Sequence, residues 1–229
     1  KGGTGGLAEV LARAAQAQGA EVRCNAGVAR VLTTNGRASG VVLENGDEIR
    51  APMVLSSLDP KQTFLNMVEP NQLPDDLVGA VRRFQTLGSS GKVNLALDRL
   101  PQLGCRPGMG RHLSGAVSIS PNLDYIEQAY DDAKYGQFSR KPYVDIIIPS
   151  MIDPDMAPPG KHVMSCFVQY APYKLADGPW TDEKREAFGD AVVDVLATYF
   201  PDIRDLILHR QVLTPVDVER ITGITEGNI

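Results

Sequence analysis

The sequence predicts a mixed α+β fold, in which an antiparallel β-meander precedes a larger module of helices packed on a mixed sheet. Two Asn-Gly pairs, at residues 35–36 and 45–46, separate short runs rich in valine and leucine, and this pattern is typical of tight β-hairpins. Between residues 188 and 199, apolar residues instead recur at the spacing of one helical face. The sequence pattern changes from predicted strands to predicted helices near residues 56–60, where we place the boundary between the two modules.

The first module begins with a helix and continues with strands. Apolar residues at positions 7, 10, 11 and 14 recur at helical spacing, and Gly19 marks the end of that helix. Strands are expected over residues 21–24 and 28–33. Because the two Asn-Gly pairs favour hairpin turns, residues 28–50 are predicted to form a three-stranded antiparallel meander. Residues 53–55 predict one more short strand.

The second module opens with two helices. The pair Asp59-Pro60 is a helix start, because aspartate caps a helix and proline suits its first position. A second helix is expected to start at residues 74–76. The second of these helices is expected to place Leu77, Val81 and Phe84 on one face.

Strands follow in the second module. Residues 92–98 alternate apolar and polar side chains, which predicts a half-buried strand. The same reasoning predicts a loop over residues 101–110, strands over 117–119, 143–148 and 162–170, and a helix over 123–135. The three consecutive isoleucines at 146–148 predict that their strand is central and covered on both faces.

Two capped helices complete the module. Thr181 is the predicted N-cap of a helix with a single apolar stripe, formed by Phe188, Val192, Val195, Leu196 and Tyr199. Near the C-terminus, Thr214 and Pro215 precede Asp217 with the spacing of an N-cap, a first-position proline and a third-position acid. This pattern predicts a last short helix.

Composition excludes several functional classes. The net charge is −5 and no basic stripe is present, so nucleic acid is not an expected partner. No apolar run reaches the roughly 18 residues that a membrane-spanning helix needs. The three cysteines are widely spaced and odd in number, which indicates a reducing compartment rather than a disulfide framework. A cytoplasmic location is the expectation, with a mitochondrial one open if a transit peptide was removed.

No catalytic constellation stands out. Residues 3–8 satisfy the dinucleotide pattern G-x-G-x-x-A in form, but no strand precedes them. His112, His162 and His209 are too scattered for a metal site, and we expect His162 on a strand and His209 near a helix end. No serine lies in a G-x-S-x-G elbow. The chemistry must therefore come from a cofactor or from a part of the protein outside this chain.

Six segments carry a resemblance to a known family. They are GGTGGL at residues 2–7, GRASGVVL at 36–43, VLSSLDP at 54–60, KVNLALD at 92–98, APPGKHV at 157–163 and LTPVDVERI at 213–221. With these segments in this order, the chain resembles the phytoene-desaturase-like FAD-dependent oxidoreductases. The resemblance implies a fragment that lacks the N-terminal Rossmann unit. Residues 1–58 would be part of the FAD-binding domain, and residues 59–229 the substrate-binding domain.

The resemblance also implies cofactor-binding residues. Val28 matches the position whose backbone contacts the flavin adenine. Ser56 and Ser57 match the stretch where the chain leaves the FAD domain, and Asn228 belongs to a stretch that leads toward the flavin. FAD is therefore the expected cofactor of the complete protein. The isolated chain is expected neither to retain FAD nor to convert substrate.

An apolar small molecule is the implied substrate, and its hydride would pass to the flavin. Gly3 and Gly5 match a loop near the substrate cavity. The candidates for the cavity wall are the aromatic residues Phe167, Tyr170, Tyr173 and Trp180, although core packing explains each of them singly as well.

Two other functions stay open. One is a non-catalytic domain derived from the same fold, which would bind a lipid or a protein through its apolar pocket. The other is an amine-oxidase-type flavoenzyme with the same architecture. Contact with a membrane surface or with a protein partner is compatible with either.

Overall fold

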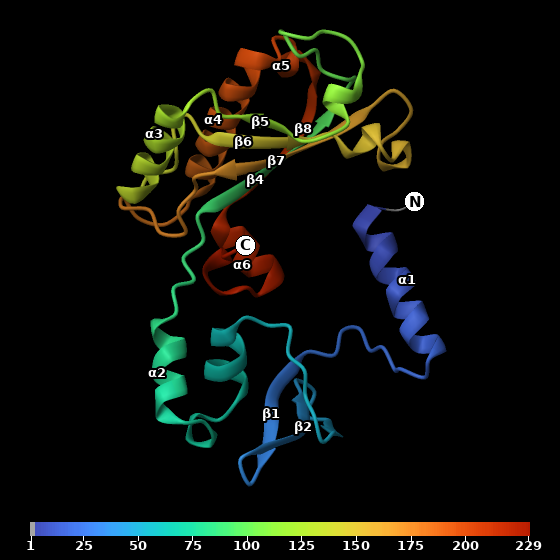
Figure 1. The fold of residues 1–229 in the computed structure, drawn as a ribbon, viewed down its shortest axis with the longest axis vertical. Coiled ribbons are helices and arrows are strands. Elements are labelled where there is room, and N and C mark those ends of the chain that lie inside the picture. The colour runs from blue at the N-terminus through green and yellow to red at the C-terminus, as the bar shows by residue number, and fades with distance from the viewer. Residues whose placement is uncertain (1–2) are drawn as a thin grey trace. The chain divides into compact units, whose positions relative to one another are not determined.

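A computed structural model describes residues 3–229 (Figure 1). Lys1 and Gly2, which begin the glycine run, lie outside the described residues. Contacts divide the chain into two compact units, one formed by Val10–Thr86 and the other by Lys1–Glu9 together with Leu87–Ile229. The predicted boundary between residues 58 and 59 concerns the domains of the complete protein and stays a prediction.

The smaller unit contains the predicted meander. Strands β1 (Val28–Thr34), β2 (Arg37–Leu43) and β3 (Glu48–Arg50) pair antiparallel in the order β1-β2-β3. Asn35 and Gly36 have φ angles of 51° and 72°, as a type I′ turn requires. The three-stranded meander is confirmed.

The second hairpin turn differs from the expected type I′ geometry. Only Gly46 has a positive φ, of 91°, and its N–H donates to the carbonyl of Leu43. The Asn45 side chain accepts the N–H of Asp47, so a local hydrogen bond takes the place of the second left-handed residue.

Two predicted strands, over residues 21–24 and 53–55, are wrong. Neither segment pairs with another strand among residues 3–229. Leu55 is 90% exposed and Met53 is 73% exposed. An apolar run forms a strand only where a neighbouring strand satisfies its backbone, and that requirement is invisible in the local sequence.

The three helical segments predicted in the first 86 residues are present. Helix α1 spans Gly3–Ala17, and none of its described side chains is buried. The Asp59 carboxylate accepts the backbone N–H groups of residues 61 and 62 and so caps a helical turn that continues as a π-helix, Gln62–Met67. Helix α2 spans Asp75–Arg83.

The buried face of α2 differs from the prediction. Val78 and Val81 are its buried residues, whereas Leu77 is half-buried. Phe84 is 54% exposed, because the chain leaves the helix at this residue and turns into an extended conformation.

The larger unit is built on a five-stranded sheet in the order β5-β6-β7-β4-β8. Its strands are β4 (Ser90–Leu97), β5 (Val117–Ile119), β6 (Tyr143–Ile147), β7 (His162–Gln169) and β8 (Ile207–Leu213). Every neighbouring pair is antiparallel, so the predicted mixed sheet is wrong. Strand β8 was not predicted, and it carries His209 shortly after the end of helix α5 (Ile203–Leu206). His162 lies on a strand, as expected.

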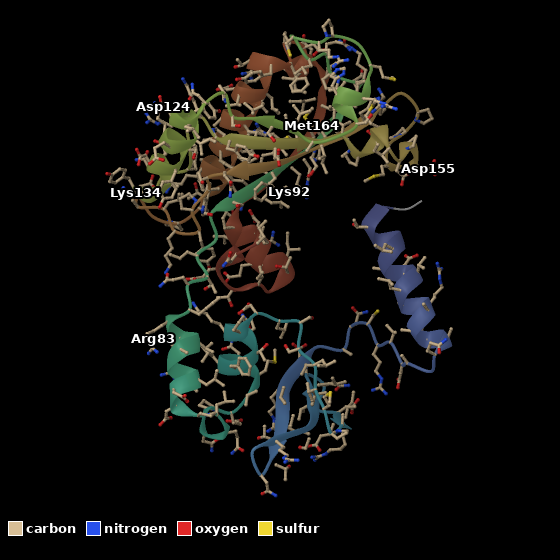
Figure 2. All side chains as sticks on the ribbon, viewed as in Figure 1. Arg83, Lys92, Asp124, Lys134, Asp155 and Met164 are labelled. Carbon is tan, nitrogen blue, oxygen red and sulfur yellow. The ribbon has the colours of Figure 1, made fainter. Side chains whose placement is uncertain are left out.

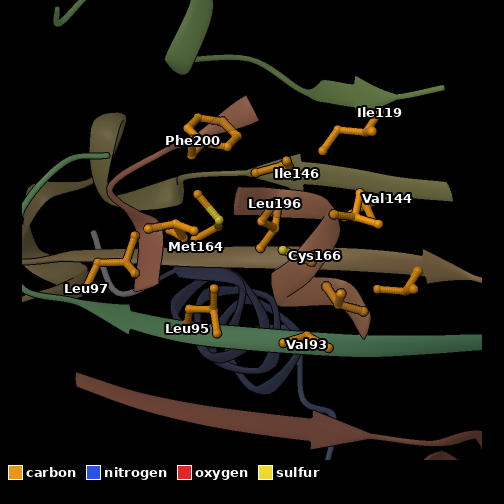
Figure 3. Packing of buried hydrophobic residues seen from close by; sticks show 14 of the residues in the cluster. Val93, Leu95, Leu97, Ile119, Val144, Ile146, Met164, Cys166, Leu196 and Phe200 are labelled. Atoms are coloured by element: carbon orange, nitrogen blue, oxygen red, sulfur yellow. The ribbon is translucent and has the colours of Figure 1, made fainter. Parts of the chain in front are cut away.

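The hydrophobic core lies between this sheet and helix α4 (Asp182–Tyr199), which begins at the predicted cap Thr181. Figure 3 shows alternate residues of the strands packed with residues of α4 and the segment that follows it. Helices α3 (Leu123–Lys134) and α5 (Ile203–Leu206) complete the unit. No helix among residues 3–229 is both long and apolar enough to cross a membrane.

The other face of the sheet stays largely uncovered. On β4, residues 93, 95 and 97 are buried in the core, so the residues between them point to the opposite face. On β6, Ile147 is 48% exposed. The strand is an inner one, but the prediction that it is covered on both faces is wrong.

The last helix, α6 (Pro215–Thr222), confirms the predicted capping box. The Thr214 hydroxyl accepts the N–H of Asp217, and the Asp217 carboxylate accepts the backbone N–H of Thr214 at 3.0 Å. Arg185 of α4 also donates to this buried carboxylate, at 3.1 Å. The box therefore ties α6 to α4 as well as starting the helix.

This arrangement predicts a stability loss in acid. Burial raises the pKa of Asp217, but the hydrogen bonds from Thr214 and Arg185 outweigh burial and hold that pKa below its ordinary value. A lowered carboxyl pKa stabilises the fold above the unfolded-state pKa of about 3.9, and this stability is lost as the pH falls through the folded-state pKa. Asp217→Asn should lower the free energy of unfolding by about 1–2 kcal/mol at neutral pH. The substitution should also make the free energy of unfolding depend less on pH in the acidic range, as measured by urea unfolding at neutral and acidic pH. An unchanged acid dependence would contradict this role.

Candidate active site

A cavity of about 640 Å³ opens on the uncovered face of the five-stranded sheet. Strands β4 and β7 provide its floor, with Lys92, Asn94 and Ser165. Its walls are the end of β6, the segment that follows it, and residues 114–116. All of these residues belong to the larger unit.

The strand register sets the polar part of the floor. Asn94 of β4 lies opposite Ser165 of β7, and opposite Gln211 of β8 on its other side. The Ser165 hydroxyl donates to the Asn94 side-chain carbonyl at 3.0 Å, and the Asn94 amide donates to Gln211 at 3.0 Å. Within residues 3–229, this chain of hydrogen bonds leaves the second amide N–H of Asn94 available to a ligand.

Lys92 is the only cationic side chain among the described residues that line the cavity. It is half-buried on β4, where Figure 2 labels it, and it forms no ion pair or side-chain hydrogen bond with any of residues 3–229. Its neighbour on β7 is Phe167, and its neighbour on β8 is Leu213. The sheet therefore presents an unpaired ammonium group beside apolar side chains.

Residues 149–156 form one wall of the cavity, in two 3₁₀ turns. Ser150 fixes this segment to the start of β7, because its hydroxyl oxygen accepts the N–H of Val163 at 3.1 Å. The same oxygen lies 3.0 Å from Nδ1 of His162. Burial lowers the pKa of His162 and so favours its neutral ring.

The predicted glycines lie on α1. Gly3 lines the cavity, and Cε of Met156 is 3.9 Å from where a Cβ on Gly3 would be. Gly5 lies further along the helix and is not among the lining residues, which include Thr4 instead. A role for either glycine in substrate binding stays a prediction.

The four aromatic candidates are not gathered around this cavity. Phe167 is on the same sheet face and is 36% exposed. Tyr170 packs edge-to-face against Tyr130, with ring centroids 5.5 Å apart. The Tyr173 hydroxyl donates a hydrogen bond to the Glu219 carboxylate. Trp180 packs against the core beside Phe138 and Phe188. For Trp180 the structure thus agrees with core packing, the alternative that the sequence left open.

The residues expected to bind FAD lie in different parts of the chain. Val28 is half-buried at the start of β1, which is an edge strand of the meander among the described residues. The outer edge of β1 can therefore offer backbone groups to an adenine ring, as the resemblance implies. The Ser56 and Thr63 hydroxyl groups are hydrogen-bonded at 2.8 Å. Ser56, Ser57 and Asn228 are all exposed. Their roles toward the cofactor stay predictions.

Sequence reasoning did not select the floor residues Lys92, Asn94 and Ser165. The available signal was the alternation over residues 92–98, which assigned Asn94 to the outward face of a half-buried strand. It could not reveal that strands far apart in the sequence bring Ser165 and the wall segment to the same face.

Comparison with known proteins identifies the family. No family model matches the chain. Pyridine nucleotide-disulfide oxidoreductase domain-containing protein 2 of Mus musculus is 38% identical over 237 aligned residues, which cover 100% of this chain. The chloroplastic prolycopene isomerase of Daucus carota is 26% identical over 231 residues. The chain belongs to the phytoene-desaturase-like oxidoreductases.

The chain corresponds to only part of its phytoene-desaturase-like relatives. It spans 41% of the length of the mouse protein and 34% of the carrot protein. A solved oxidoreductase structure from Methanosarcina mazei shares the fold, with a TM-score of 0.62 and 22% identity. That match covers 93% of this chain and 43% of the solved one, which again places the chain within a longer oxidoreductase fold.

Proposed function

We propose that the chain is the substrate-binding part, with a portion of the FAD-binding part, of an FAD-dependent oxidoreductase. The complete protein would transfer a hydride from a largely apolar substrate to the flavin. The observation that carries this proposal is the cavity on the uncovered face of the five-stranded sheet. The family membership supplies the reaction class.

The cavity has the character of a ligand site. Large apolar side chains on its walls are exposed, with Ile147 at 48%, Ile152 at 70% and Met156 at 41%. Exposed apolar surface of this kind is costly in water, and it commonly marks a surface that a ligand or another part of a protein covers. Together with the polar floor, the walls suit a substrate that is mostly apolar.

The residues of this chain would bind and orient the substrate. FAD, when bound in the complete protein, supplies the hydride acceptor. The edge backbone of β1 at Val28 fits the adenine end of that cofactor. The isoleucine and methionine walls of the cavity would exclude water from the reacting part of the substrate. Binding the substrate, orienting it and excluding water require no acid–base pair in the chain.

The isolated chain is expected to pass through gel filtration without bound flavin. Residues 3–229 contain no strand–glycine turn–helix unit of the kind that binds a dinucleotide pyrophosphate. The edge of β1 alone would contact only the adenine. The visible absorption spectrum of the eluted protein measures this directly. Stoichiometric FAD on the isolated chain would contradict the proposal that this chain holds only a portion of the FAD-binding part.

The complete protein is the matched comparison. It should elute with about one FAD per chain. If the complete protein folds but does not bind added FAD, the chain is instead part of a non-catalytic binding protein.

A further inference from the structure

We propose that the cavity binds an amphipathic ligand, an apolar chain that carries a carboxylate, and that Lys92 pairs with this carboxylate. The inference rests on the proposed function only in taking this cavity as the substrate site. It deepens that function, because a wholly apolar substrate would leave the polar floor without partners.

Lys92 has no charged partner among residues 3–229. The side chain is half-buried, and no group of residues 3–229 forms an ion pair or a side-chain hydrogen bond with it. Asp153 also lines the cavity, but it makes no ion pair with Lys92. Holding a cation partly out of water is unfavourable unless an anion compensates it, so a negatively charged ligand group is the complementary partner.

Asn94 adds a hydrogen-bond donor on the same strand as Lys92. Residues two apart on a strand point to the same face and lie about 6.6 Å apart along it, so Asn94 follows Lys92 along the floor. Asn94 uses its carbonyl for Ser165 and one amide N–H for Gln211, which leaves one N–H to donate. An ammonium group and an amide N–H together match the two oxygens of a carboxylate.

The wall of the cavity carries large apolar side chains. Ile147, Ile152 and Met156 present exposed apolar surface to the same cavity. The volume of about 640 Å³ lies within the range of roughly 300–1,000 Å³ that is typical of small-molecule sites. One side of the cavity thus suits a carboxylate and the other suits a hydrocarbon chain.

Equilibrium dialysis of the complete protein with radiolabelled laurate and radiolabelled dodecanol tests this inference. The two probes have the same hydrocarbon chain and differ in the charged head group. We expect the protein to bind laurate about tenfold more tightly than dodecanol, the preference that an ionic hydrogen bond provides. Lys92→Met should abolish the preference, because it weakens laurate binding much more than dodecanol binding, and Lys92→Arg should retain most of it.

Lys134→Met is the matched control, because this lysine lies on α3, far along the chain from the cavity floor and outside the cavity lining (Figure 2). It should bind both probes like the wild type. Equal affinity of the wild type for the two probes, no binding of either, or an equal loss of both in Lys92→Met would overturn the inference. Flavin content is measured in the same samples. A flavin-free complete protein that keeps the Lys92-dependent preference would contradict the flavoenzyme proposal and support this one.

Discussion

Replacing Phe188 with alanine is expected to lower the free energy of unfolding of the chain by about 3–5 kcal/mol. Phe188 is 0% exposed in the centre of α4. Its ring contacts Phe138 and Trp180 edge-to-face, with centroids 5.7 Å and 5.9 Å away. Truncation would remove these contacts and leave a cavity where the helix meets the sheet. Since Trp180 is the only tryptophan, its fluorescence reports urea unfolding of this core directly.

Leu123→Ala is the matched control for this prediction. Leu123 is also on a helix of the larger unit, but it is 82% exposed. Its truncation should change the free energy of unfolding by no more than about 0.5 kcal/mol. A Phe188→Ala loss as small as the Leu123→Ala loss would show that α4 does not anchor the sheet.

Replacing Gly40 with alanine should disrupt the meander, at a cost on the order of 2 kcal/mol or more. Gly40 lies on β2 with φ of 148°, a conformation that other residues rarely adopt. A Cβ at this position would overlap the backbone carbonyl oxygen of Ile49 on β3. Neither strand can move away without breaking the ladder between them. Amide hydrogen exchange over residues 28–50 should therefore become much faster, and the complete protein should lose FAD.

Gly36→Ala separates the two causes of that effect. Gly36 also has a positive φ, of 72°, but nothing lies within 4 Å of the position of a Cβ. This variant should therefore show only the backbone cost of about 1–2 kcal/mol. If Gly40→Ala exchanges no faster than Gly36→Ala, the close approach of β2 and β3 does not constrain the meander.

Local signals explain why most elements could be predicted. Thr181 and Thr214 start their helices as N-caps, because capping depends on residues within one turn. The alternation on β4 identified its buried face in the same way. Strand β8 was missed and residues 53–55 were wrongly assigned, because strand formation depends on a partner elsewhere in the chain.

The candidate site depends almost entirely on such distant pairings. Lys92 and Ser165 are 73 positions apart in the sequence, and only the register of β4 with β7 brings them to one face. The aromatic residues Tyr170, Tyr173 and Trp180 have a composition typical of a cavity wall, but the structure places none of them in the cavity lining. The residue types predicted that the site would be apolar. Its location could be identified only once the order of the strands in the sheet was known.

The most direct test of the account is anaerobic reduction of the flavin in the complete protein by the apolar lipid fraction of its own cells. The flavin absorbance is followed in the wild type and in Ser165→Phe, which fills the cavity floor. Thr198→Phe, on an exposed position of α4, is the control. We expect the flavin to bleach in the wild type and in Thr198→Phe but not in Ser165→Phe. Equal bleaching in all three proteins, or none in the wild type, would contradict the claim that this cavity is the substrate site of a flavoenzyme.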